Sequence, residues 1–181
     1  MKILYYNTSY ESFQQISALL NTINIPVVWI QQNQGYLTID DLIKQAPITA
    51  EPCTLPDISV MIFHEMSDEQ INEVIALLKQ HGITIPYKCI VTKHNQTWRF
   101  IKLFQELIEE HEYFNTYEQL KQCIAQVSEL HEADYCEDSW KQYETAFMIG
   151  YFLLQKQSSV DELKSAVQAI NTAKAKLSKK G

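Results

Sequence analysis

Glycine and arginine are both scarce in this 181-residue sequence, which has four glycines and a single arginine, Arg99. Loops that bind nucleotide phosphates need several closely spaced glycines, so dinucleotide fingerprints and P-loops are excluded. Proteins that grip phosphates or carboxylates with paired hydrogen bonds usually carry more arginine than this. The acidic balance, 15 Lys+Arg against 22 Asp+Glu with net charge -7, argues against a nucleic-acid partner.

Long apolar runs and paired-cysteine motifs are absent as well. The longest apolar run, AFMIGYFLL at 146–154, is well short of the ~18 residues that a membrane-spanning helix needs. The start of the chain lacks the features of a secretory signal peptide, so we expect a cytoplasmic protein without a membrane span. The four cysteines show no Cys-x-x-Cys spacing, which favours reduced thiols in that compartment.

Signatures of catalysis and of metal binding are also missing. None of the five histidines belongs to a His-Glu-x-x-His or cysteine–histidine motif, and no Gly-x-Ser-x-Gly nucleophile motif occurs. We therefore expect no catalytic centre, no metal and no cofactor. An enzyme that uses Glu110, His111 or His94 as an acid or base is the third of three hypotheses, because histidine titrates near neutral pH.

What the sequence does contain is an alternation of strand and helix patterns. Short β-type runs alternate with helical stripes, the runs at 2–6, 27–30, 58–63 and 88–92 and the stripes at 9–23, 38–46, 67–81 and 97–112. This order predicts an α/β fold in which two tandem β-α-β-α units form one small sheet, about four-stranded and largely parallel.

The two units resemble each other, which suggests an internal repeat. The helical pattern of residues 13–20 recurs at 71–78, and the pair Ile25-Pro26 recurs as Ile85-Pro86. Amphipathic helices also match by chance, so duplication and coincidence both stay open. Residues 47–57, which contain three prolines, are the best candidate for a linker between the units.

Helical patterns replace strand patterns after His111. They cover 116–133, 139–155 and 159–177. Capping boxes predict helix starts at 67–70, 116–119 and 159–162. We therefore expect three regions, with 1–57 and 58–114 as the two units of one α/β core and 115–181 as an all-helical extension.

A strand, a polar turn and a helix follow one another between Ile85 and His111. The carboxyl end of a strand beside a helix N-terminus is the usual ligand crevice of open α/β sheets and favours anions. The candidate ligand-binding residues, which offer hydrogen bonds, positive charge and a stacking surface, are Lys88, Thr92, Asn95, Trp98 and Arg99. A helix cap at Asn95 or Thr97, with Trp98 in the core, explains the same residues without a ligand, so both interpretations stay open.

A wider pattern runs through this part of the chain, carried by Pro86, Lys88, Thr92, Asn95, Trp98 and Glu110. Over about Ser59 to Glu112 the sequence resembles a bacterial family described as a domain of unknown function, number 3783 in that series. The chain departs from the family pattern at Cys89, Lys93 and His94, and its helical tail has no counterpart there. The resemblance implies a fold and the position of a site, but no activity.

The helix predicted at 139–155 is apolar on nearly every side, so it must be covered from several directions. An aromatic and apolar seam runs along it at three- and four-residue steps, formed by Trp140, Tyr143, Phe147, Tyr151 and Leu154. An antiparallel hairpin with the last helix covers one side, and the α/β core or a second subunit must cover the rest.

Two further hypotheses follow from these features. The first is a non-enzymatic interaction or regulatory module that docks onto a protein partner or dimerises through its C-terminal helices. The second is a small-molecule or anion-binding domain that uses the turn at 92–98.

Overall fold

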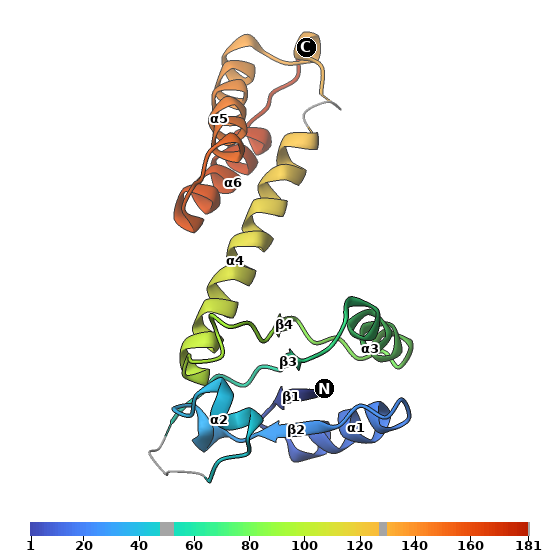
Figure 1. Ribbon diagram of the computed structural model, residues 1–181. Coiled ribbons are helices and arrows are strands. Elements are labelled where there is room, and N and C mark those ends of the chain that lie inside the picture. Colours follow the sequence, from blue (N-terminus) through green and yellow to red (C-terminus); the bar gives the residue numbers. More distant parts are fainter. Residues whose placement is uncertain (48–52, 127–129, 181) are drawn as a thin grey trace. The chain divides into compact units, whose positions relative to one another are not determined.

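The computed structural model describes residues 1–47, 53–126 and 130–180 (Figure 1). The chain forms two compact units, Met1–Ile108 and Glu109–Gly181. The first unit contains the sheet, and the second is built from helices.

In its described residues the first unit has a four-stranded sheet in the order β2-β1-β3-β4. The strands are β1 (Lys2–Tyr6), β2 (Val27–Ile30), β3 (Val60–His64) and β4 (Tyr87–Ile90). β1 pairs in parallel with β2, and β3 with β4, whereas the central strands β1 and β3 pair antiparallel. The predicted α/β fold with a largely parallel sheet is therefore confirmed.

Helices cover both faces of this sheet. On one face, α1 (Tyr10–Asn21) and α3 (Asp68–Gln80) pack against the side of the central strands that carries Ile3 and Met61. On the other, α2 (Ile39–Ile43) and the start of α4 (Phe100–Ala125) pack against the side that carries Leu4 and Ile62. Right-handed crossovers put α1 and α3 on the same face because the two parallel pairs run in opposite directions.

The described end of the proline-rich segment packs into this unit rather than separating two halves. Part of the predicted linker, 48–52, lies outside the described residues. Leu55 is buried in the core, and the Tyr6 hydroxyl donates to the carbonyl oxygen of Pro56 at 3.1 Å. Burial, together with the neighbouring Asp57 and Cys53, raises the pKa of Tyr6 to about 12. The described part of this segment therefore packs against the carboxyl end of β1.

A single helix, α4, runs from Phe100 to Ala125, so the predicted helix start at 116–119 is wrong. Thr116 is buried, and its hydroxyl donates to the carbonyl oxygen of Glu112 at 2.8 Å. Its hydroxyl therefore bonds back within the helix instead of capping a new one, a use of threonine that a capping box cannot reveal. The boundary between the two units falls inside α4, after Ile108.

In the second unit, α5 (Glu137–Gln155) and α6 (Val160–Ala175) form a hairpin that packs with the later part of α4. The helices approach closely at Gly150, where an added Cβ would lie 2.8 Å from Ile170 Cδ1 and 3.1 Å from Leu120 Cδ1. Short backbone bridges close the open end of the hairpin, among them Cys136 N–H to the Ser178 carbonyl at 2.8 Å. The predicted all-helical C-terminal region is confirmed.

Candidate functional site

The turns that follow β2 and β4 bind each other. Thr38 and Arg99 form an antiparallel bridge between them. Four reciprocal backbone hydrogen bonds flank this bridge, from Ile39 to Trp98 (3.0 Å), Phe100 to Leu37 (2.9 Å), Asp40 to Gln96 (3.0 Å) and Ile101 to Gly35 (2.8 Å). Each bond in one direction has a counterpart in the other, so the two turns meet about an approximate two-fold axis.

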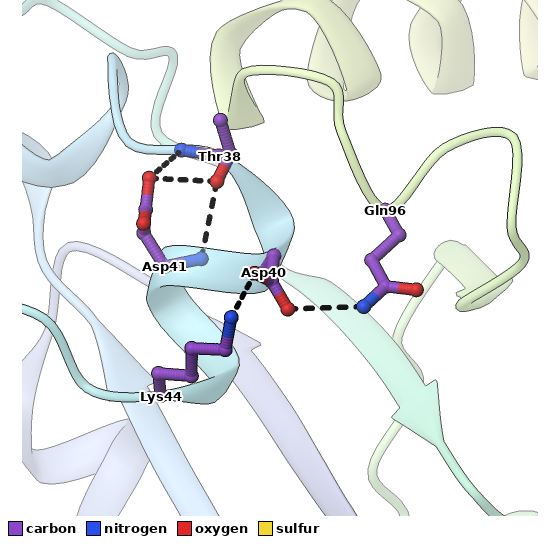
Figure 2. Close-up of polar contacts among 5 residues, drawn as sticks. All are labelled: Thr38, Asp40, Asp41, Lys44 and Gln96. Carbon is purple, nitrogen blue, oxygen red and sulfur yellow. Dashed lines mark hydrogen bonds and ion pairs between the residues drawn. The ribbon is translucent and has the colours of Figure 1, made fainter.

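Side chains reinforce this junction at the start of α2 (Figure 2). Asp40 pairs with Lys44 and accepts a 3.0 Å hydrogen bond from Gln96 Nε2. Hydrogen bonds, the one from Lys44 first, hold the pKa of Asp40 below its usual value. Thr38 and Asp41 form a capping box, with Asp41 N–H donating to Thr38 Oγ1 at 3.1 Å. Both carboxylates therefore stabilise the junction.

The junction uses the amide groups that an anion would need. In α2 the first three N–H groups donate to Trp98, Gln96 and the Thr38 hydroxyl. In α4 the first three donate to Leu37, Gly35 and Arg99. Because anions bind helix N-termini through such open N–H groups, this geometry favours a structural role for the turns.

Two of the predicted ligand residues, Thr92 and Asn95, bond to each other in the turn after β4. Asn95 Oδ1 accepts from Thr92 N–H at 2.8 Å, and Asn95 Nδ2 donates to the Ile90 carbonyl at 2.9 Å. In return, Asn95 N–H donates to Thr92 Oγ1 at 3.2 Å. Both ends of the Asn95 side chain are thus engaged within the turn, with residues that precede it, and do not cap α4, which begins at Phe100.

Trp98 and Arg99 lie at the same junction but point to different neighbours. Trp98 packs against the core, with the His94 ring 4.9 Å from its ring and Lys102 Nζ 4.2 Å above it. The Arg99 guanidinium lies 5.8 Å from the ring of Tyr36. These are cation–π contacts within the protein, which account for both side chains without a ligand.

Lys88 lies on the opposite face of the sheet from Trp98. Its neighbours in β4, Tyr87 and Cys89, pack toward the α2 and α4 side, whereas Lys88 lines a small cavity of about 50 Å³ beside α3. Burial, and then the charge of Lys79, lower the pKa of Lys88. The structure therefore does not bring Lys88 to the Thr92–Trp98 turn, and ligand binding by the five residues stays a prediction.

The predicted interface residues of α5 fall into two groups. Tyr143 belongs to the core of the helical unit, and Trp140 and Leu154 are half-buried against it. Phe147 is half-buried and stacks on Tyr151, with 6.2 Å between the ring centroids. Only Tyr151 is exposed. The seam thus packs mainly within the unit, and its role as an interface between copies stays a prediction.

Exposed apolar side chains lie on other sides of the same helix. Met148 is 57% exposed, Ile149 55%, Tyr151 48% and Phe152 63%, and we call these four residues the α5 patch. Three of them fall outside the seam. The signal for them was the apolar character of the helix all round, since a helix in a small cluster buries only part of its circumference.

A groove of about 470 Å³ lies between α5 and α6. Ala146 on α5 and Ala169 and Ala173 on α6 contribute small side chains to its walls, and Lys176 lies at one end. The sequence analysis did not predict this groove, because it depends on how the two helices pair.

The candidate acid and base residues are divided between the two units. His94 belongs to the first unit, whereas Glu110 and His111 belong to the second, where Glu110 is exposed. Among the described residues no three histidine, cysteine or acidic side chains come together in a way that could hold a metal ion. In the same part of the chain, every helix is too short or too polar to cross a membrane.

Residues 59–114 match the model of the family described as "Domain of unknown function (DUF3783)". The predicted resemblance is therefore confirmed. The matched segment spans β3, α3, β4 and the first part of α4, which is the second β-α-β-α unit with the start of the long helix. No curated protein and no solved structure matches the chain.

Proposed function

We propose that this protein is a cytoplasmic, non-enzymatic interaction module that self-associates through the α5 patch. The observation that carries the proposal is the exposure of four large apolar side chains within five consecutive residues of one helix. Single exposed apolar residues are ordinary, but a contiguous group of this kind is typical of an interaction surface.

The charge pattern supports the same function. No residue from 145 to 155 is charged, although the outer face of a surface helix normally carries charged side chains. A second copy of this face meets no like charge there, even though the whole chain carries net charge -7.

The size of the patch predicts how strong the association is. Four side chains that are each about half exposed offer roughly 400 Å² of apolar surface. A dimer covers the patches of both copies, roughly 800 Å², which gains on the order of 20 kcal/mol at about 25 cal/mol per Å². The loss of translational and rotational freedom, together with the ordering of the eight side chains, costs a similar amount. We therefore expect a weak dimer that forms with rising concentration.

Sedimentation velocity of the whole chain from about 1 μM to about 1 mM tests the proposal. The wild type should shift from monomer to dimer, whereas Ile149→Glu and Phe152→Glu should remain monomeric. Phe114→Glu is the matched control, because Phe114 is 55% exposed on α4, outside the patch, and its variant should dimerise like the wild type. A wild type that stays monomeric throughout this range would overturn the proposal.

The thiols support the proposed cytoplasmic location. Cys123 Sγ donates to Asn171 Oδ1 at 3.8 Å, and Cys136 Sγ donates to the Lys179 carbonyl at 3.6 Å. Both contacts require a reduced S–H group, which the cytoplasm maintains. Burial also raises the pKa of Cys53, which slows its oxidation.

We also propose that the two β-α-β-α units arose by duplication. The reciprocal bonds between the turns relate each residue of 35–40 to the one 61 positions later, in 96–101. A chain in which residues 92–99 are replaced by the sequence of 31–38 tests this equivalence and leaves Gly35, which has no room for a side chain, unchanged. It should fold cooperatively with moderately reduced stability, whereas loss of the fold would contradict it.

A further inference from the structure

The α5 patch is flanked by one charged residue at each end, and the two charges have opposite signs. Glu144 is the last charged residue before the patch, and Lys156 is the first after it. Both side chains are exposed, and Gly150, the midpoint of the patch, lies midway between them in the sequence. The rise of an α-helix places the two charges about 18 Å apart along the helix axis. The two ends of the patch are therefore alike in distance from its centre and opposite in charge.

The contacts of the neighbouring side chains keep these charges available to a partner. Lys156 Nζ lies 5.6 Å from the centroid of the Phe152 ring, so the positive charge stays beside the patch. Glu162 pairs with Lys156 at 3.2 Å, but both side chains are nearly half exposed, and such exposed pairs are weak. At the other end, Lys141 is paired with Glu137 at 2.6 Å and therefore does not cancel the acidic flank.

The apolar contact is small, and it does not by itself select a direction for the partner. Two patches bury roughly 800 Å² in total, below the about 1,200–2,000 Å² of stable interfaces, and apolar burial is not directional. In an antiparallel two-fold pair, Glu144 of each copy is level with Lys156 of the other along the helix axes. In a parallel pair, each of these charges would instead be level with its own counterpart, which repels it. The flanking charges therefore favour the antiparallel direction.

The same arrangement matches the side chains on the outer face of α5. Thr145, Met148, Phe152 and Gln155 follow one another at steps of three and four, so they form one stripe, and all four are exposed in the single chain. A two-fold axis level with Gly150 places Met148 of one copy against Phe152 of the other. It also places Thr145 level with Gln155, so apolar residues meet at the centre of the contact and uncharged polar residues meet at its ends.

We infer that this chain forms an antiparallel two-fold dimer in which α5 packs against α5 of the second copy, with the axis level with Gly150 and Glu144 of each copy level with Lys156 of the other. This inference rests on the proposed self-association through the α5 patch and adds its direction and register. The occupant is a second copy of this chain, because the patch turned end to end supplies the charge that each flank lacks.

Charge reversal tests the direction at low ionic strength, where exposed charges are least screened. Glu144→Lys and Lys156→Glu each turn two attractive pairs per dimer into two repulsive ones, so each should weaken dimerisation about tenfold. The first variant makes the chain more positive and the second makes it more negative, so an effect of net charge alone would shift their dimerisation in opposite directions. The double variant keeps the net charge and restores both pairs, so it should dimerise within about threefold of the wild type. Sedimentation velocity measures all four chains.

Disulfide formation tests the register independently. Thr145→Cys and Gln155→Cys each place one new thiol on the exposed stripe. In the antiparallel dimer position 145 is level with position 155 of the other copy, whereas two positions 145 lie about 15 Å apart along the axis, too far for a disulfide. An equal mixture of the two variants in a glutathione redox buffer should therefore form the disulfide between 145 and 155 rather than either symmetric one. Mass spectrometry of the linked peptides identifies the pairing and separates it from any disulfide of the native cysteines.

The outcomes separate the two proposals. If the wild type never dimerises, both fail. If Phe152→Glu abolishes the dimer but the single charge variants dimerise like the wild type, or the double variant does not recover, or the symmetric disulfides predominate, self-association stands and the antiparallel register is overturned. Weakening in both single variants, recovery in the double variant and preferred linkage of 145 to 155 support the inference.

Discussion

Gly35 provides the sharpest test of how the chain closes its α/β core. Its φ of -57° is one that any residue adopts, so its backbone conformation does not require glycine. An added Cβ, however, would lie 2.4 Å from Cys53 Sγ and 3.3 Å from Cys53 Cβ, far inside the ~3.5–4.0 Å of a favourable contact. We therefore expect Gly35→Ala to destabilise the first unit by about 1–3 kcal/mol through overpacking.

A double-mutant cycle with Cys53→Ala isolates this contact. Cys53→Ala alone removes one heavy atom and should cost about 0.5–1.5 kcal/mol, and in its presence Gly35→Ala should cost little more. The expected coupling free energy is about 1–2 kcal/mol. Urea denaturation followed by the fluorescence of Trp29 and Trp98, both in the first unit, gives the free energies. Additive changes in the free energy of unfolding, or no change for Gly35→Ala, would refute the packing of Cys53 against Gly35 in the turn after β2.

Three further predictions concern buried or paired side chains. Tyr143→Phe should stabilise the helical unit by about 1 kcal/mol in chemical denaturation, because the buried hydroxyl has no hydrogen-bond partner among the described residues; destabilisation would reveal one. Since the pKa of Tyr6 is raised to about 12, its contribution to stability should be complete below pH 10 and lost as the pH rises through about 12, a loss that Tyr6→Phe should not show. Because the pKa of Asp40 is lowered, Asp40→Asn should be less stable than the wild type above about pH 4, and the difference should shrink as the pH falls through that lowered pKa; a constant difference would contradict the assigned pairing.

Local sequence patterns predicted a helix correctly where the residues at its start form a capping box that the structure contains. Capping boxes at Ser67 and Ser159 mark the starts of α3 and α6. The box at Thr116 failed because the same residue types occur inside a continuous helix, where Thr116 bonds back to Glu112. Whether a helix ends depends also on its tertiary surroundings, and Thr116 is buried.

The order of the strands and the contacts at the candidate site could not be predicted from the sequence. Nothing in the strand patterns indicates that β1 and β3 pair antiparallel, since both are apolar on two faces and fit either direction. Asn95 was correctly placed in a turn, but its engagement at both ends depends on the Ile90 carbonyl and the Thr92 backbone. Likewise, the sequence placed Lys88 and Trp98 in one candidate site. In the structure they lie on opposite faces of the sheet, because successive side chains of a strand point to opposite faces.

The two units differ in whether the groups that the sequence analysis singled out are bonded or packed within the unit. In the α/β unit the polar turns after β2 and β4 bind each other through reciprocal hydrogen bonds. Each turn therefore supplies carbonyl acceptors for the first N–H groups of the helix that follows the other turn. In the helical unit α5 packs in a small cluster that buries Tyr143, Ala146, Gly150 and Leu153 on one side and leaves the α5 patch exposed on the other. Leaving roughly 400 Å² of apolar surface in water is unfavourable, and the proposed self-association would cover the same surface on two copies at once. The same physical argument favours a structural role for the polar turns and underlies the proposal of an interaction role for the apolar helix.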